Sequence, residues 1–143
     1  MHPFGFGRLA AGLGLLAAVA LPACSPAAAA PSVRTVAVTI HYSRFSPDHL
    51  HVPAGTTVRF RITNTDPIDH EFILGNQAVQ DEMERTTETV HDGSVPGMVS
   101  VPALSTVTTV VTLPRPAGTT LIYACHLPGH FAYGMRGTLV ISA

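Results

Sequence analysis

The stretch YACHLPGHFAYGM, residues 123 to 135, places one cysteine, two histidines and one methionine close together. Its proline and glycines predict a turn-rich loop between a strand that ends at Cys125 and a strand that begins at Gly137. Such a loop brings Cys125, His130 and Met135 to one end of the fold. A thiolate, an imidazole and a thioether in one loop indicate a metal site, whereas the competing interpretation is a chance group of core residues.

Short segments on both sides of this loop are rich in β-branched residues or alternate between apolar and polar residues, and they are separated by Pro, Gly, Asn and Asp. The predicted strands cover residues 33–40, 56–64, 70–74, 97–101, 105–113, 119–125 and 137–142. About seven or eight such strands predict an all-β fold, a Greek-key β-sandwich. Residues 76–94 are polar and acidic, and they predict a long connection that carries a short helix.

The composition limits the classes of function. The chain has 143 residues, of which 46% are hydrophobic, and this is enough for one domain with a single core. Only 12% of residues are charged, the formal net charge is −1, and no basic run is present. A nucleic-acid partner is therefore not expected, and we expect a monomer.

The N-terminal residues predict an exported protein. Residues 1–24 have an early positive charge, an apolar run and the ending LPAC, which resembles a bacterial lipobox with Cys24 as the lipidated residue. An ordinary signal cleaved near PAAAAP, with Cys24 discarded, is the alternative. Residues 25–32 then form a Pro/Ala-rich tether, and residues 33–143 form the folded domain. The expected location is the periplasm or cell envelope of a bacterium, with membrane anchoring through Cys24.

A mature domain without Cys24 contains Cys125 as its one cysteine and can form no internal disulfide. The segment TNTDPIDHEFIL, residues 63–74, offers His70 at the start of a predicted strand as a further ligand. Two imidazoles, one thiolate and a weak axial thioether form the site that holds copper in a trigonal geometry for electron transfer. The alternative for His70 is a strand-end histidine that hydrogen-bonds a carbonyl group.

The chain resembles a cupredoxin, a small blue copper protein, over most of residues 33–143. Its ligand loop is similar to those of rusticyanin and of the type 1 copper site in multicopper oxidases. The resemblance implies one type 1 copper ion bound by His70, Cys125 and His130, with Met135 as the axial ligand. It also implies that electrons pass through the exposed edge of His130. The apolar patch around that edge, where a redox protein would dock, consists of Leu127, Pro128 and Phe131.

Two positions depart from the patterns of such proteins. Glu71 follows His70, where many cupredoxins have an Asn or Ser that clamps the loop carrying the cysteine. His126 follows Cys125, but Ala124 precedes it, so the HCH sequence that reaches a trinuclear copper cluster in multicopper oxidases is absent. We therefore expect no enzymatic activity.

Other histidines and methionines have two interpretations each. His49 and His51 would share one side of a strand, and they are either a weak second copper site or solvated surface residues. His126 is expected to be structural or to lie at the surface. The other set that could capture Cu(I), with ordinary packing as the alternative, consists of Met83, Glu84, His91 and Met98.

The predicted function is single-electron transfer by Cu(I)/Cu(II) cycling between redox partners. The alternative is a periplasmic copper-binding protein for copper resistance, buffering or delivery. A structural or adhesion sandwich without metal is the third class, and the ligand loop argues against it.

Overall fold

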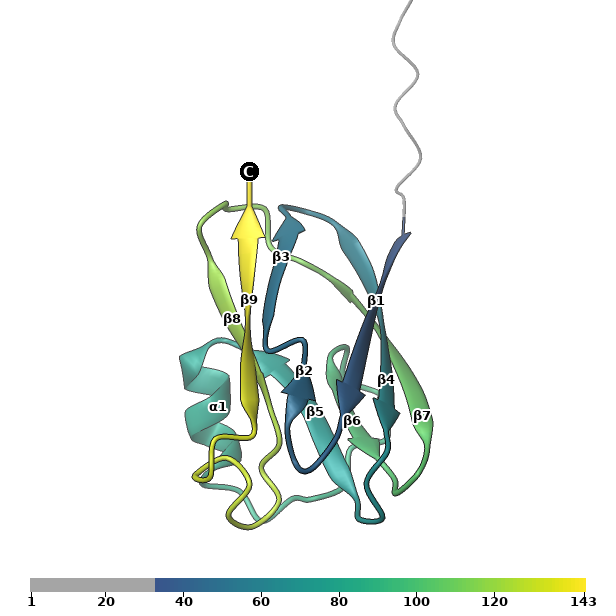
Figure 1. Cartoon of the computed structure of the whole chain (residues 1–143). Helices are drawn as coiled ribbons and strands as arrows, with labels where there is room; N and C mark the ends of the chain where they lie inside the picture. The colour runs from purple at the N-terminus through teal and green to yellow at the C-terminus, as the bar shows by residue number, and fades with distance from the viewer. Residues whose placement is uncertain (1–32) are drawn as a thin grey trace, which may run out of the picture.

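A computed structural model describes residues 33–143 as two β-sheets packed face to face, with one short helix beside them (Figure 1). The strands of this range are β1 (Val33–Ile40), β2 (Phe45–Ser46), β3 (His49–Pro53), β4 (Thr57–Asn64), β5 (His70–Gly75), β6 (Met98–Val101), β7 (Thr106–Thr112), β8 (Thr120–Ala124) and β9 (Arg136–Ser142), and the helix is α1 (Gln77–Met83). The predicted all-β sandwich is therefore confirmed.

The predicted signal peptide, Cys24 and the tether fall in residues 1–32 and lie outside the described residues. From residue 33 onward, no helix combines the length and the apolar character needed to cross a membrane.

The two sheets have four and five strands, in the orders β2-β1-β4-β7 and β3-β9-β8-β5-β6. Both sheets are mixed, because β1 runs parallel to β4 and β3 runs parallel to β9, whereas the other pairs are antiparallel. The strands β8 and β9, which flank the predicted ligand loop, are neighbours in the five-stranded sheet. This pairing fixes both ends of the loop.

Burial follows the period of two expected for strands that have one face in a core. In β4, Val58, Phe60 and Ile62 are fully buried and alternate with more exposed residues. Strand β5 departs from this pattern, because all its residues from His70 to Leu74 are buried. It lies between β8 and β6, and α1 packs beside it, so both of its faces are covered.

The structure has two strands beyond the segments predicted from periodicity, and the second of them contains His49 and His51, which were expected on one side of a strand. Strand β2 has only two residues, too few for a periodic signal, and it pairs with the end of β1. Strand β3 pairs along its length with β9, a partner distant in the sequence. The polar connection predicted at residues 76–94 does carry a short helix, α1, which begins after Asn76, whose side chain caps the amide of Val79.

The helix is attached to the five-stranded sheet through Gln80, which is fully buried. The side-chain amide of Gln80 donates to the carbonyl oxygens of Ile73 in β5 and Ile122 in β8, at 3.3 and 3.1 Å. These bonds satisfy a buried polar group and hold the helix beside the end of β8.

Aromatic side chains fill the core beneath the ligand loop. The ring of Tyr123 in β8 stacks on Phe72, with 5.6 Å between ring centroids, and meets Phe45 edge-on at 5.4 Å. Its hydroxyl donates to the carbonyl of Pro47 at 2.7 Å. Gly137 lies directly opposite Tyr123 in β9, and a Cβ atom there would lie 2.3 Å from the tyrosine ring. The absence of a side chain at position 137 is therefore what admits this ring.

Gly137→Ala should lower the free energy of unfolding by about 1–3 kcal/mol, because an added methyl group would overpack the site. Alanine also restricts the unfolded chain more than glycine does, and this effect would stabilise the folded state by only about 0.4–1 kcal/mol. Urea unfolding measures the effect. In a Tyr123→Leu background, which removes the crowding ring, the same glycine substitution should cost much less; equal costs in the two backgrounds would contradict the packing argument.

Candidate metal centre

The predicted ligand loop runs from Cys125 to Met135 and is shaped by turns that the sequence encodes. Gly129 and Gly134 adopt φ angles of +84° and +85°, a region that residues with a side chain rarely occupy. The amide of Met135 donates to the carbonyl of His130, and the amide of Cys125 donates to the carbonyl of Met135, at 2.9 and 3.2 Å. The chain thus returns beside its starting point, which places the three residues together.

Three predicted ligands converge at the end of the sandwich. The Sγ atom of Cys125 lies 3.2 Å from Nδ1 of His130 and 4.0 Å from Nδ1 of His70, and the two Nδ1 atoms are 3.3 Å apart. Metal–nitrogen bonds of about 2.0–2.1 Å and metal–sulfur bonds of about 2.3 Å place donor atoms at separations of this order. Within residues 33–143, this is the one group of three or more His, Cys, Asp or Glu side chains arranged to hold a metal ion.

Met135, the predicted axial ligand, is 1% exposed and belongs to the same buried cluster as Cys125. Its backbone bonds to Cys125 and His130 place it beside both residues. Its coordination stays a prediction.

Burial shifts the pKa values of two predicted ligands toward their neutral forms. Burial raises the pKa of the Cys125 thiol to about 11, although amide groups of Leu127 and Glu71 act in the opposite direction. Burial, together with the neighbouring His70, lowers the pKa of His130. A metal ion that binds this thiol must displace its proton, and a soft metal ion would stabilise the resulting thiolate. One sulfur and two imidazole nitrogens are a donor set that suits copper.

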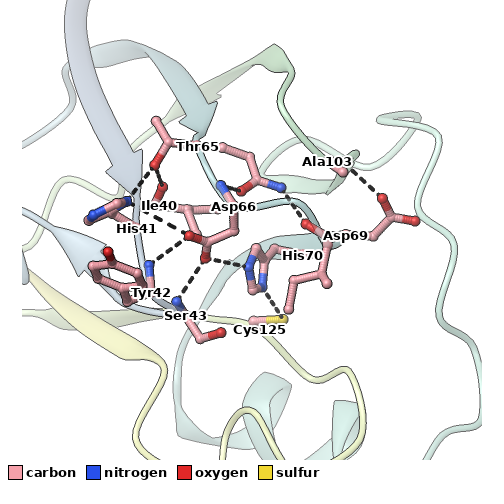
Figure 2. A network of polar contacts seen from close by, with 12 residues as sticks. Ile40, His41, Tyr42, Ser43, Thr65, Asp66, Asp69, His70, Ala103 and Cys125 are labelled. Carbon is pink, nitrogen blue, oxygen red and sulfur yellow. Dashed lines mark hydrogen bonds and ion pairs between the residues drawn. The ribbon is translucent and has the colours of Figure 1, made fainter.

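The imidazole ring of His70 is held at Nε2, the nitrogen that faces away from Cys125 and His130. Its Nε2 lies 2.9 Å from the Oδ2 atom of Asp66, and Figure 2 shows the carboxylate and Cys125 on opposite sides of the ring. Asp66 is 5% exposed and also accepts the backbone amides of Tyr42 and Ser43, at 2.7 and 2.8 Å. Burial would raise the pKa of Asp66, but these amides and His70 outweigh it and lower the pKa below its usual value of 3.8.

Asp66 is positioned by Asn64, at the end of β4. The side chain of Asn64 accepts the amide of Asp66 and donates to the carbonyl groups of Ile68, Val101 and Pro102. The turn between β4 and β5 is thereby fixed before His70 begins its strand. Asp66 was not recognised from the sequence, because a separation of four residues along the chain does not reveal that its side chain contacts His70.

Glu71, which follows His70, clamps the ligand loop beside Cys125. Its Oε2 atom accepts the backbone amide of His126 at 3.0 Å, and its own amide donates to Sγ of Cys125 at 3.3 Å. Burial raises the pKa of Glu71. Its Oε1 atom is buried without a hydrogen-bond partner, with Nε2 of His91 at 3.6 Å. A carboxylate thus fixes the backbone of the ligand loop next to the cysteine.

His126 has a structural environment. Its Nδ1 is 2.6 Å from a carboxylate oxygen of Glu84, and its Nε2 is 2.7 Å from the side-chain oxygen of Gln80. Phe131 stacks on the ring with 4.8 Å between centroids, so this aromatic residue faces His126. Both ring nitrogens are engaged, and His126 offers no free donor for a second metal ion.

The remaining histidines and methionines do not gather into a second centre in the described part of the chain. His49 and His51 are exposed on β3, and His49 bonds the hydroxyl of Thr138. The Met83, Glu84, His91 and Met98 set is divided between two cavities: the first two residues line one beside His126, and the others line a separate one.

The outer side of the centre is a surface hollow of about 460 Å³ at His130, which is partly exposed. The lining residues are Tyr42, Ser43, Arg44, Pro128, His130 and Tyr133. Tyr42 and Tyr133 are 82% and 83% exposed. Tyr42 was not recognised from the sequence, because it reaches the site from a turn far from the ligand loop, and Tyr133, although it lies within that loop, carried no signal of its exposure.

Comparisons with known proteins agree with this architecture. A family model described as a cupredoxin-like domain matches residues 14–141. The copper-resistant cuproprotein CopI of Rubrivivax gelatinosus is 37% identical over 121 residues, which cover 81% of this chain and 71% of that protein. The protein of the same name from Pseudomonas aeruginosa is 26% identical over 148 residues, with 81% and 80% covered.

Among solved structures, auracyanin B superposes with a TM-score of 0.64 and 25% identity, and the match covers 80% of this chain and 91% of that one. Auracyanin A, described as a blue copper protein from Chloroflexus aurantiacus, has a TM-score of 0.62 and 23% identity over 78% of this chain and all of that one. The second likeness concerns the fold alone.

Glu71→Ala should lower the free energy of unfolding of the metal-free protein by about 1–3 kcal/mol, because the buried amide of His126 would lose its acceptor. Glu71→Gln, which keeps an oxygen at this place, should retain most of the stability. Urea unfolding compares both with Glu88→Ala, which removes an exposed carboxylate of the same chain. A loss for Glu71→Ala no larger than that for Glu88→Ala would show that the clamp contributes nothing.

Proposed function

The chain belongs to the cupredoxin-like family, and from this premise we propose that it binds one type 1 copper ion and carries single electrons. The ligands are His70, Cys125 and His130, with Met135 in the axial position. The observation that carries the proposal is the convergence of one buried cysteine sulfur and two Nδ1 atoms within bonding range of a single ion. The names of the two relatives described as copper-resistant cuproproteins support the choice of metal.

Bound copper supplies one-electron cycling between Cu(I) and Cu(II). The protein holds the donors in a fixed arrangement: Asp66 orients His70, the amide of Glu71 bonds the sulfur, and the Glu71 carboxylate fixes the loop backbone. Donors that do not move keep the reorganisation cost of a one-electron step small. The buried position of Cys125 keeps water away from the sulfur.

His130 provides the route for electrons, because it is the ligand at the surface hollow. A redox protein is proposed to dock there, on Leu127 and Pro128 together with the exposed rings of Tyr42 and Tyr133. Phe131, which the resemblance also places in this patch, is partly exposed and stacks on His126.

Copper resistance is the second candidate, and the names of the two curated relatives favour it. In that role the protein would buffer or deliver copper in the periplasm or cell envelope. A carrier retains its copper through repeated oxidation and reduction, whereas a copper-handling protein releases Cu(I) to a competing chelator. Copper content measured after redox cycles in the presence of a Cu(I) chelator separates the two roles.

An enzymatic role is not part of the proposal. A multicopper oxidase needs histidines beside the cysteine to reach further copper ions, and here both ring nitrogens of His126 are bonded to Glu84 and Gln80. Export and anchoring through Cys24 stay predictions from the sequence.

Cys125→Ser in the full chain should abolish the intense visible absorption of the copper-loaded protein, because that band arises from transfer of charge from thiolate to copper. Visible spectra after loading with Cu(II) provide the measurement. The control Cys24→Ser removes the chain's other cysteine and should leave the band unchanged. A wild-type protein that stays colourless, or a band that survives Cys125→Ser, would refute the type 1 site.

Met135→Leu should keep the copper and raise the reduction potential, because a thioether donor that helps to stabilise Cu(II) is replaced by a hydrocarbon of similar volume. Each tenfold weakening of Cu(II) relative to Cu(I) corresponds to about 59 mV. Voltammetry compares the variant with Met98→Leu, a partly buried methionine in β6. Equal potentials for the two variants would show that Met135 does not coordinate.

A further inference from the structure

The contact between Asp66 and His70 determines which nitrogen of the imidazole can face a metal. A neutral histidine carries its proton on one ring nitrogen and has a lone pair on the other. Asp66 is held as a carboxylate by the amides of Tyr42 and Ser43, and it presents only acceptor atoms to Nε2 of His70. The proton must therefore reside on Nε2, and the lone pair is on Nδ1, the atom that faces Cys125 and His130.

A carboxylate partner also changes the strength of the ligand. An imidazole that donates its second N–H to a carboxylate is a stronger donor to a metal ion, and such outer partners typically contribute about 10–100-fold in metal affinity. The side chains of His70 and Asp66 are 0% and 7% exposed, so water weakens their 2.9 Å interaction little. The gain is greater for Cu(II) than for Cu(I), because the higher charge attracts more electron density from the ring.

The carboxylate uses both oxygens at once, and an amide cannot replace it. Oδ1 accepts from Tyr42, and Oδ2 accepts from both Ser43 and His70. An asparagine at position 66 would direct its NH₂ group either at the amide of Tyr42 or at Ser43 and His70, where donors would oppose donors. In the second orientation the asparagine favours a lone pair on Nε2 and so the Nδ1–H tautomer of His70, which cannot bind a metal through Nδ1.

We propose that Asp66 is a positioning residue of the metal centre, which holds His70 as the Nε2–H tautomer and lowers the reduction potential by strengthening this ligand toward Cu(II). The inference rests on the proposed copper function, but the tautomer exists in the metal-free protein and can be tested there. Asp66 also bonds the turn that presents Tyr42 to the hollow at His130, so the same carboxylate fixes a buried ligand and part of the outer surface.

The experiment compares full-length wild-type protein with Asp66→Asn and with Asp69→Asn. Asp69 is the matched control, because it lies in the same turn, carries the same charge and bonds only the amide of Ala103 among the described residues. Two-bond ¹H–¹⁵N spectra of the metal-free proteins report the tautomer of His70. Competition titrations with Zn(II) report the metal affinity, and voltammetry of the copper-loaded proteins reports the potential.

Wild-type protein and Asp69→Asn should show His70 protonated at Nε2, whereas Asp66→Asn should show a mixture of tautomers or the Nδ1–H form. Asp66→Asn should also bind Zn(II) about 10–100-fold more weakly and have a higher reduction potential, by about 59 mV for each tenfold change in the Cu(II)/Cu(I) preference. A residue that only stabilised the fold would change the unfolding transition without changing the tautomer.

A wild-type His70 protonated at Nδ1 overturns the proposal, and this result needs no variant, so it holds even if Asp66→Asn fails to fold. A Zn(II) affinity and a potential in Asp66→Asn equal to those in Asp69→Asn overturn it as well. Failure of the copper function itself has a different signature, because the wild-type protein would then lack the visible band. The tautomer and Zn(II) measurements would still test the role of Asp66.

Discussion

The burial of Cys125 is the constraint on which the rest of the centre depends. The residue continues from the end of β8, with its side chain in the core and its amide bonded to Met135. A buried thiolate is costly unless a cation or several donors stabilise it, and the pKa of this thiol is raised to about 11, chiefly by burial. The histidine nitrogens and the amide of Glu71 that surround the sulfur make sense as the environment of a thiolate bound to a soft cation.

Two carboxylates support this environment from different directions. Asp66 bonds the side chain of His70, a proposed ligand, and Glu71 bonds the backbone of the loop that follows Cys125. Both are buried, and an ionised carboxylate near the centre would favour a bound cation. Burial raises the pKa of Glu71 and leaves one of its oxygens without a hydrogen-bond partner, whereas at Asp66 burial is outweighed by the bonds from Tyr42, Ser43 and His70, which lower the pKa.

The sandwich positions this centre through strand pairing. Pairing of β8 with β9 closes the ligand loop, and pairing of β5 with β8 brings His70 alongside Cys125 from a distant part of the sequence. Gly137 admits the ring of Tyr123 beneath the loop, so the core and the site share one packing arrangement. The turn after β1 then reaches the same end of the sandwich and places Tyr42 at the hollow beside His130.

The sequence by itself determined the β-sandwich, because period-two segments and turn residues are local signals, and it determined the loop from Cys125 to Met135, because three donors lie within one short segment. It also singled out His70, since the resemblance and the chemistry of copper both required a second imidazole; the structure places this residue beside the loop. Only the tertiary structure decided what surrounds these residues. The bond from Asp66 to His70, the reach of Glu71 to the amide of His126, and the arrival of Tyr42 join segments whose proximity depends on strand order. Those contacts form between side chains after the sheets have packed, and no local pattern in the chain encodes which oxygen meets which nitrogen.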